Sequence, residues 1–443
     1  ELMLSESQER MLLAVRPEGL GEVLKVFEKY EIPYAVLGRV TGDRTLKVWF
    51  KGEQVVNLPA ELVARAPAIR RKARKPRMLE KLLRVPKPRQ PEKLEEALLK
   101  LVSSPNIASK EWVYRQYDHE VGVRTVVKPG EGDAAVLRLL EAPGAVAVTF
   151  DGNSRHSALD PFNGHAGTLA EAARNIACVG AEPLAYTDCC NFGNPEKPEV
   201  FWQFKRGIEG LAYMSRRLQI PCVGGNVSFY NEDEETGRAV KPTTTVVMLG
   251  LIERLEWVTT LGFKEPGSSI ILVGKTYPEL GGSEYYHEIH GIDGGRPPKA
   301  SWRREKATIK TVMEAIRSGL VKAAHDCSKG GLAIALALMS IKGGLGAKVD
   351  LRKIPSANVR RLDELLFSET YARIILEVER ENARKVLRIA SKNGAPAAVI
   401  GEVSDSDEFI FHKAGKPVIS CSLDEMSHLW RSLIPSMMEG VKV

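Results

Sequence analysis

Small polar residues follow two glycines in the segment Pro221-Cys222-Val223-Gly224-Gly225-Asn226-Val227-Ser228-Phe229. Glycine lets a ligand's phosphate approach backbone N–H groups, and an adjacent Asn or Ser can donate to phosphate or bind a hard cation through oxygen. A Gly-Gly-Asn sequence is also ordinary turn chemistry. The pattern therefore indicates either a phosphate site around Gly225, Asn226 and Ser228 or a plain turn.

An aspartate lies at the end of a second apolar run, in Tyr186-Thr187-Asp188-Cys189-Cys190-Asn191. Ligands of open α/β sheets bind beyond the carboxyl ends of strands, where a carboxylate can hold Mg²⁺ or polar atoms of a nucleotide. Asp188 could instead cap the turn that follows.

A third polar group, Glu6-Ser7-Gln8, comes directly before an apolar run that is typical of a strand. Three such side chains would be costly in a core, so we interpret them as ligand contacts. Asp326, at a predicted strand-to-helix turn, fits a phosphate site or a helix cap. The isolated histidines His156 and His165 have no metal-ligand spacing. The sequence contains no G-x-x-x-x-G-K-[ST] loop, H-E-x-x-H motif or nucleophile elbow, which argues against covalent and zinc chemistry.

The composition is that of a globular protein of two or three domains, with 44% hydrophobic and 27% charged residues in 443. Six cysteines without framework spacing, no long apolar run and no leader pattern favour a cytoplasmic protein without a membrane segment. The net charge of +7 is local, because the stretch from Arg65 to Arg89 contains eleven basic residues and one acidic residue. Because four prolines interrupt this stretch, we interpret it as a solvated linker rather than a nucleic-acid site.

Two segments align at a constant offset of 363 residues and form an internal repeat. Leu4 to Leu13 matches Phe367 to Leu376, and Ala35 to Val40 matches Ala398 to Val403. Each copy is predicted to be a strand, an amphipathic helix and a second strand. The strands are expected at Met11 to Val15 and 35–40, and at Ile374 to Val378 and 398–403. About a hundred residues precede the second copy from Pro266, but only a few precede the first, so we expect the first copy to be truncated.

The middle of the chain alternates apolar runs with helical patterns, which predicts an α/β (α+β) fold. We expect four parts: a partial domain (1–68), a basic linker (69–92), a nucleotide-binding-type domain (93–257) and a complete C-terminal domain (258–443).

Several motifs together resemble the small-type synthetase subunit of formylglycinamide ribonucleotide amidotransferase. They occur in order along the chain and are Ser5-Glu6-Ser7-Gln8-Glu9-Arg10-Met11, Gln116-Tyr117-Asp118-His119, Asp160-Pro161-Phe162-Asn163-Gly164, Gly180-Ala181-Glu182-Pro183-Leu184, Gly224-Gly225-Asn226-Val227-Ser228-Phe229-Tyr230-Asn231-Glu232 and Leu280-Gly281-Gly282-Ser283-Glu284-Tyr285. The resemblance implies two tandem copies of the fold of aminoimidazole ribonucleotide synthetase, the first truncated here and the second complete.

The resemblance also implies an ATP-dependent C–N ligase of purine biosynthesis. ATP would activate the amide oxygen of formylglycinamide ribonucleotide as an iminophosphate, and ammonia would displace phosphate. Carried over from the family, the substrate contacts are Glu6, Ser7, Gln8 and Ser228, the ATP contacts are Asp188 and Gly225, and the Mg²⁺ ligand is Asn226.

The family's catalytic histidines belong to a part of the first copy that this sequence does not contain, and Asn153 stands at the equivalent position of the second copy. We therefore expect no catalytic residue in this chain and no activity from it alone. The implied partners are the missing N-terminal portion, a glutaminase subunit and a small bridging subunit. The alternatives are another enzyme of the superfamily, such as selenophosphate synthetase, and a non-catalytic nucleotide-binding or assembly module.

Overall fold

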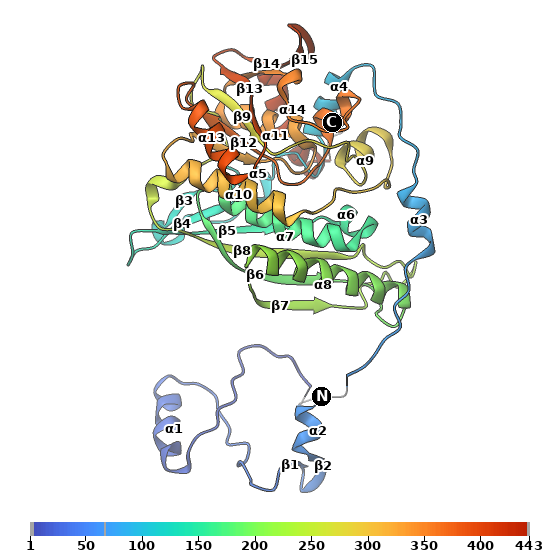
Figure 1. Cartoon of the computed structure of the whole chain (residues 1–443). Helices are drawn as coiled ribbons and strands as arrows, with labels where there is room; N and C mark the ends of the chain where they lie inside the picture. Colours follow the sequence, from blue (N-terminus) through green and yellow to red (C-terminus); the bar gives the residue numbers. More distant parts are fainter. Residues whose placement is uncertain (1–3, 66–67, 441–443) are drawn as a thin grey trace. The chain divides into compact units, whose positions relative to one another are not determined.

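The computed structural model describes residues 4–65 and 68–440, which form two compact units, residues 1–70 and 71–443. Figure 1 shows both units. Within the described ranges no helix is long and apolar enough to cross a membrane.

Unit 1 is a small set of elements without a core, because none of its described residues is buried. A short 3-10 turn, Pro17–Gly19, leads into the amphipathic helix α1. Strands β1 and β2 then form an antiparallel hairpin, which is followed by the one-turn helix α2. The bounds are Leu20–Lys29 for α1, Thr45–Phe50 for β1, Glu53–Pro59 for β2 and Ala60–Ala64 for α2.

The internal repeat extends further than the sequence pattern indicated. At the same offset of 363, α1 corresponds to α13 (Ala383–Asn393), β1 to β14 (Glu408–Lys413), β2 to β15 (Lys416–Ser422), and α2 to the start of α14 (Leu423–Met438). The strands predicted for the second copy are confirmed as β12 (Ile374–Val378) and β13 (Ala397–Ser404).

The two strands predicted for the first copy, at Met11 to Val15 and 35–40, are wrong: both stretches are irregular. The two copies differ in whether a neighbouring strand is available for pairing. In the second copy β12 and β13 both pair with β9 (Ser269–Val273), and no described residue of unit 1 takes the place of β9. A strand with neither backbone partners nor a covered face has little to stabilise it.

Unit 2 begins with the basic segment that the sequence suggested was a solvated linker. It contains the helix α3 (Arg77–Leu83), whose Leu79 is buried. Arg74 pairs with Glu199, and Lys87 lies 2.7 Å from Glu364. From residue 71 onward, part of its positive charge is therefore neutralised on the body of unit 2. Helices α4 (Leu94–Val102) and α5 (Glu111–Tyr114) follow.

A six-stranded sheet forms the first layer of unit 2, in the order β3-β4-β5-β8-β6-β7. Helices α7 and α8 pack beside it (Figure 1). Asp160 caps α7 by accepting a hydrogen bond from the backbone of Asn163, and Pro161 fits the first turn. The bounds are Thr125–Val127 (β3), Ala135–Arg138 (β4), Ala145–Asp151 (β5), Ser154–Leu159 (α6), Pro161–Cys178 (α7), Glu182–Asn191 (β6), Pro198–Leu218 (α8), Cys222–Ser228 (β7) and Thr243–Ile252 (β8).

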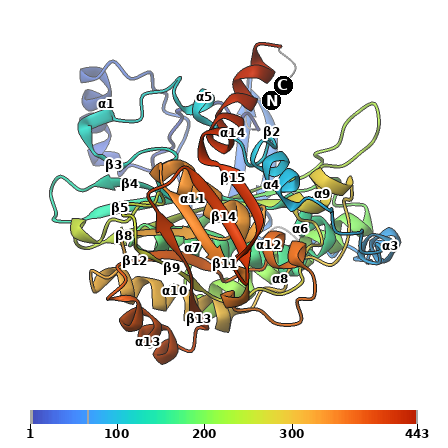
Figure 2. The same ribbon diagram turned by 90° about the horizontal axis from the view of Figure 1, so that it is seen from above.

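A seven-stranded sheet forms the second layer, in the order β10-β12-β9-β13-β11-β14-β15 (Figures 1 and 2). Helix α10 contacts both α7 and strands β9 and β12, so it lies between the two layers. Buried apolar residues of α11, α12 and α14 fill one core of this layer. The remaining bounds are Glu284–His290 (α9), Trp302–Arg317 (α10), Ala323–Asp326 (β10), Gly331–Gly343 (α11), Gly346–Asp350 (β11) and Leu362–Phe367 (α12).

Candidate functional site

Asp188 and Gly225 lie opposite each other on the parallel strands β6 and β7, the latter at the edge of the sheet. A Cβ atom built on Gly225 would lie 2.1 Å from Oδ1 of Asp188. The carboxylate therefore rests against the glycine backbone, and any side chain there would collide with it. The structure brings together these two residues, which the sequence had placed in separate motifs.

The Asp188 carboxyl group is partly withdrawn from solvent, and this burial raises its pKa. Its other oxygen, Oδ2, is 4.0 Å from the thiol of Cys222, and no cation pairs with it in the described parts of the chain. A carboxylate with a raised pKa and no ion-pair partner is suited to accept a hydrogen bond from a ligand or to bind a cation that accompanies the ligand. Asp188 lies within β6, so the alternative of a turn cap does not hold.

Asn226 and Ser228 follow Gly225 on β7. Their side chains project from the face of the sheet opposite to that of Asp188, because side chains alternate along a strand. Asn226 is exposed and lies opposite Cys189. Ser228 is half-buried, and its hydroxyl donates to Oδ1 of Asn231 at 3.1 Å. Four of the predicted site residues thus share one strand pair, with Asp188 on one face and the Asn226 amide and the Ser228 hydroxyl on the other.

The loop after β7 is held by aromatic and ionic contacts. Phe229 packs edge-on against Phe204 of α8, with 5.0 Å between ring centroids. The Glu232 carboxylate accepts from the backbone N–H of Asn194 and pairs with Lys197 at 2.7 Å. These contacts fix the end of β7, and with it the position of the Ser228 hydroxyl.

Glu6, Ser7 and Gln8 lie in unit 1 and are exposed. Their hydrogen bonds are local: the Ser7 hydroxyl is 2.8 Å from that of Ser5, and the Gln8 amide donates to the carbonyl of Glu6. These three side chains are free to meet a ligand.

Their counterparts in the second copy, Glu369, Thr370 and Tyr371, are all buried. The Glu369 carboxylate accepts from the backbone N–H groups of Glu284 and Gly330. The two triples therefore differ in the structure, because the first is exposed and the second is engaged inside the protein.

Tyr371 fills the space next to helix α7. A Cβ built on Gly167 would lie 2.3 Å from the tyrosine ring, and the phenol oxygen is 2.8 Å from Nδ1 of His156. The lack of a side chain at Gly167 of α7 thus leaves the space that the tyrosine ring occupies. His165, the other isolated histidine, is buried; burial lowers its pKa to about 4, and its Nδ1 is 2.7 Å from the Pro161 carbonyl oxygen.

A buried ion network that the sequence did not suggest joins the two layers of unit 2. Arg174 is fully buried and binds both oxygens of Asp326, at 2.5 and 3.1 Å, and one oxygen of Glu305 at 2.8 Å. Asp326 is therefore a structural partner of Arg174 rather than a helix cap, since the residue before α11 is Gly330. The available signal was one arginine within the alanine-rich pattern of α7.

Two further buried carboxyl groups lie close to this network. Burial is the main cause that raises the pKa of both Asp151 and Glu171, and the charge of Glu171 raises that of Asp151 further. Asp151 accepts hydrogen bonds from Thr149 and Asn175.

No three His, Cys, Asp or Glu side chains in the described ranges are grouped so that they could hold a metal ion. On the face of β7 that carries Asn226, the neighbouring oxygen donor is Ser228, and Asp188 points from the opposite face. These residues do not form a complete set of protein ligands for Mg²⁺. The arrangement fits a Mg²⁺ ion that takes one ligand from the protein, Asn226, keeps several waters and binds phosphate oxygens.

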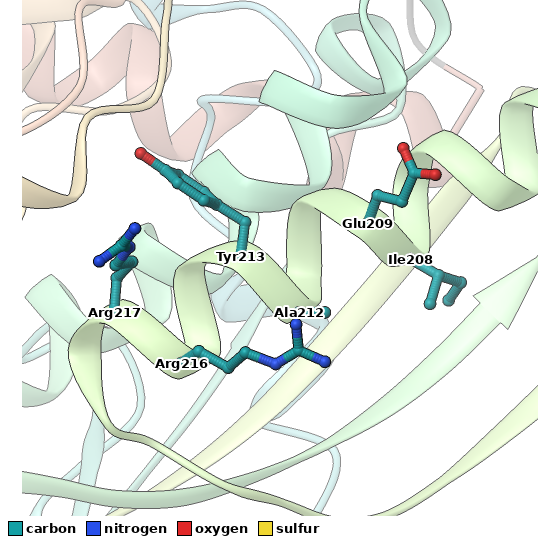
Figure 3. A pocket seen from close by; sticks show the side chains of 6 residues that line it. All are labelled: Ile208, Glu209, Ala212, Tyr213, Arg216 and Arg217. Carbon is teal, nitrogen blue, oxygen red and sulfur yellow. The ribbon is translucent and has the colours of Figure 1, made fainter.

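A surface hollow of about 550 Å³ lies elsewhere, on α8 (Figure 3). It contains none of the predicted site residues and is lined by Ile208, Glu209, Ala212, Tyr213, Arg216 and Arg217.

Comparison with known families identifies the class of protein. The pattern of the AIR synthase related protein N-terminal domain matches residues 131–252, and that of the C-terminal domain matches both 1–51 and 265–413. The chain belongs to the AIR synthase related family. The double match of the C-terminal domain agrees with the tandem fold expected from the repeat.

The relatives narrow this class. The chain is 45% identical over 99% of its length to the phosphoribosylformylglycinamidine synthase subunit PurL of Moorella thermoacetica, and 46% identical over 99% to that of Methanocaldococcus jannaschii. It spans 59% of the length of each. The resemblance drawn from the motifs is thereby confirmed.

Solved structures of PurL from T. maritima share the fold. The complex with FGAR gives a TM-score of 0.64 at 22% identity, covering 76% of this chain and 54% of that one. The complex with ATP gives 0.59 at 22% identity, covering 76% and 53%. The PurLQS assembly from Thermotoga maritima gives 0.62 at 22% identity, covering 81% and 55%.

Proposed function

We propose that this chain contributes nucleotide and substrate contacts to an ATP-dependent C–N ligase that converts formylglycinamide ribonucleotide to formylglycinamidine ribonucleotide. The observation that carries the proposal is the contact between the Asp188 carboxylate and the Gly225 backbone. It lies on the pair of strands that also carries Asn226 and Ser228. The PurL names of relatives that match 99% of the chain support the same reaction.

In this proposal, Asp188 and Gly225 contact ATP. The bare backbone of Gly225 lets a ligand approach closely, and Asp188 accepts a hydrogen bond from the nucleotide. Asn226 supplies one oxygen to Mg²⁺, which neutralises charge on the phosphates when bound. Ser228, together with Glu6, Ser7 and Gln8, contacts the substrate.

The chemistry has two steps. The amide oxygen of the substrate takes the γ-phosphoryl group of ATP and releases ADP, and ammonia then adds to the activated carbon and expels phosphate. Catalysis of this kind depends on positioning and on electrostatic stabilisation of the phosphoryl group. The contribution of β6 and β7 is to position donors and acceptors on a hydrogen-bonded strand pair.

The proposed partners follow from the parts of the reaction that these residues do not supply. Ammonia comes from glutamine on a glutaminase subunit, with a small bridging subunit, as the name PurLQS suggests for the Thermotoga maritima assembly. The catalytic histidines come from an N-terminal portion of the synthetase subunit. The setting is the cytoplasm, and this chain by itself is inactive.

Reconstitution tests the proposal. The chain is mixed with the part of the Moorella thermoacetica subunit that it does not cover and with a glutaminase subunit, and glutamine- and ATP-dependent product is measured by mass spectrometry. Product that disappears in Asp188→Ala supports the proposal. Absence of product from wild-type components that form a stable complex contradicts it.

A second candidate is a non-catalytic nucleotide-binding module, which the buried state of Glu369, Thr370 and Tyr371 favours for the second copy. Equilibrium dialysis with radiolabelled ATP separates the two functions. Nucleotide retained unhydrolysed by the reconstituted complex favours the module, whereas turnover favours the ligase.

A further inference from the structure

Another hollow lies on the seven-stranded sheet, in a different layer of unit 2 from Asp188 and Gly225. Its volume is about 220 Å³, which is less than the roughly 300 Å³ at which pockets for drug-sized ligands begin. At about 30 Å³ for each water, it has room for roughly seven waters, or for a small ion with part of its hydration shell. It is lined by Gly267, Ser269, Lys348, Asp350, Lys353, Arg380, Val399, Ile400, Gly401, Glu402 and His412.

The strand register places charged side chains together on one face of this sheet, across β13, β11 and β14 (Figure 2). Lys348 of β11 lies opposite Glu402 of β13. Asp350, two residues further along β11, lies opposite His412 of β14. Opposed residues, and residues two apart on one strand, project from the same face. Val349, between the two on β11, is buried in the core on the other face.

The backbone leaves space for a ligand above these strands. The pairing of β13 with β9 shifts between Val399 and Gly401, which marks a β-bulge. Bulges bend a strand and redirect its side chains. At Gly267, just before β9, nothing lies within 4 Å of the position that a Cβ atom would take. The hollow is therefore open on the side of β9.

Most acidic groups around the hollow already have a cation. Both oxygens of Asp350 accept hydrogen bonds from the Arg352 guanidinium, at 3.0 and 2.8 Å, and this lowers the pKa of Asp350. Glu379, at the end of the neighbouring strand, pairs with Lys322 at 3.0 Å. Within residues 4–65 and 68–440, Glu402 is the lining carboxylate without an ion pair.

The basic groups of the lining, in contrast, have no such partners. Lys348, Lys353 and Arg380 are exposed and form no ion pair in the part of the chain that the structure describes. Nδ1 of His412 is buried and has no hydrogen-bond partner among the described residues. Three cations and this ring nitrogen thus accompany one carboxylate, Glu402. A buried polar atom without a partner calls for an ion or water that satisfies it.

We propose that this hollow binds a small phosphate anion, either inorganic phosphate or the phosphoryl group of a small monoester. A phosphoryl group carries about two negative charges at pH 7, and Lys348, Lys353 and Arg380 neutralise them. Arginine presents a planar fork of donors to phosphate oxygens, and lysine presents a point charge. The tautomer of His412 that carries a proton on Nδ1 donates one more hydrogen bond.

Glu402 gives the hollow a preference among anions. Its carboxylate can accept a hydrogen bond from the P–O–H group of hydrogen phosphate or from a hydroxyl group of a monoester. Sulfate has no hydrogen to donate at pH 7, so its oxygens would face the carboxylate as like charges. This site does not depend on the proposed reaction, because none of its lining residues contributes to the nucleotide and substrate contacts.

The test is equilibrium dialysis of the full chain with radiolabelled inorganic phosphate at pH 7. We expect a dissociation constant of about 1 mM or lower, weakened at least about tenfold in Lys353→Gln and in Arg380→Gln. Phosphate held near Asn226 and Ser228 would survive both substitutions, so the binding that the variants lose measures this hollow. Both side chains are exposed, and urea unfolding of the variants should match that of the wild type.

Lys413→Gln is the matched control. Lys413 is exposed and follows His412 on β14, but it does not line the hollow. Its substitution removes the same charge as Lys353→Gln and should change phosphate binding by less than about twofold. Equal losses in the two variants would show a general effect of positive charge and overturn the proposal.

Competition with glycerol 3-phosphate and sulfate identifies the ligand. Glycerol 3-phosphate that binds more tightly than phosphate assigns a monoester, and weaker binding assigns free phosphate. Sulfate should bind at least about tenfold more weakly than the tighter of the two, and Glu402→Gln should reduce that preference. A phosphate dissociation constant above about 10 mM, or sulfate that binds as tightly as phosphate, would leave an adventitious ion only and overturn the proposal.

Discussion

Replacing Gly225 with alanine should disturb Asp188 directly. The added methyl group would lie 3.0 Å from Cγ of Asp188 and only 2.1 Å from its Oδ1. The second distance is shorter than Cβ atoms show in real structures. Either the carboxylate rotates away or the edge strand β7 moves. We expect a loss of about 1–2 kcal/mol in the free energy of unfolding, near the lower end for overpacking because one side of β7 has no neighbouring strand.

The neighbouring glycine supplies the control. A Cβ on Gly224 would meet only the Thr187 side chain, at 3.6 Å, which is ordinary van der Waals contact. Gly224→Ala should therefore change the free energy of unfolding by less than about 0.5 kcal/mol. The two variants add the same methyl group to adjacent positions of one strand.

The assays are urea unfolding of the chain and calorimetric titration of the reconstituted complex with ATP. Displacement of the carboxylate should raise the ATP dissociation constant at least about tenfold in Gly225→Ala, equivalent to about 1.4 kcal/mol, with little change in Gly224→Ala. Similar unfolding free energies for both variants would refute the steric reasoning. A destabilised Gly225→Ala variant with unchanged ATP affinity would instead refute the role of Asp188 in nucleotide binding.

Three further predictions concern the buried groups of unit 2. Arg174→Met should lower the free energy of unfolding by about 3–5 kcal/mol, because it leaves the buried Asp326 without its cation; a loss below about 1 kcal/mol in urea unfolding would contradict this. Asp151→Asn should stabilise the protein at pH 8 but not at pH 4. The pKa of the folded-state carboxyl group is raised, so its contribution is present below the unfolded value of about 3.9 and is lost as pH rises through the folded value. Parallel stability profiles of the variant and wild type from pH 4 to 8 would count against it. Tyr371→Phe should cost about 1 kcal/mol, because the phenol hydroxyl near Nδ1 of His156 is lost while the ring remains, as thermal unfolding can measure.

The fold of unit 2 followed from the sequence wherever a pattern was local. The apolar run of β12 and the amphipathic pattern of α13 are each a short-range signal, and both formed as predicted. Lys87 and Leu79 show the limit of this approach. A basic, proline-containing stretch looks solvated until the structure supplies Glu364 as an ion-pair partner for Lys87 and a buried position for Leu79.

The candidate site was only partly accessible from the sequence. Glycine, amide and hydroxyl residues in one segment indicated a phosphate site, because those residue types limit what a strand end can do. The sequence did not show that Asp188 touches Gly225, which depends on the parallel register of β6 and β7. Nor did it show that Tyr371 occupies the space over Gly167, a contact between residues 204 positions apart by their numbers.

The sequence by itself determined the repeat, the α/β class and the residue types at the proposed nucleotide and substrate positions, since periodicity and residue chemistry are properties of neighbouring positions. The tertiary structure decided which strands form. Met11 to Val15 and Ile374 to Val378 carry the same pattern, yet only the second is a strand, because only it lies beside β9. A strand is stabilised by hydrogen bonds to a neighbour and by burial of its faces, and a linear pattern cannot show whether that neighbour is there.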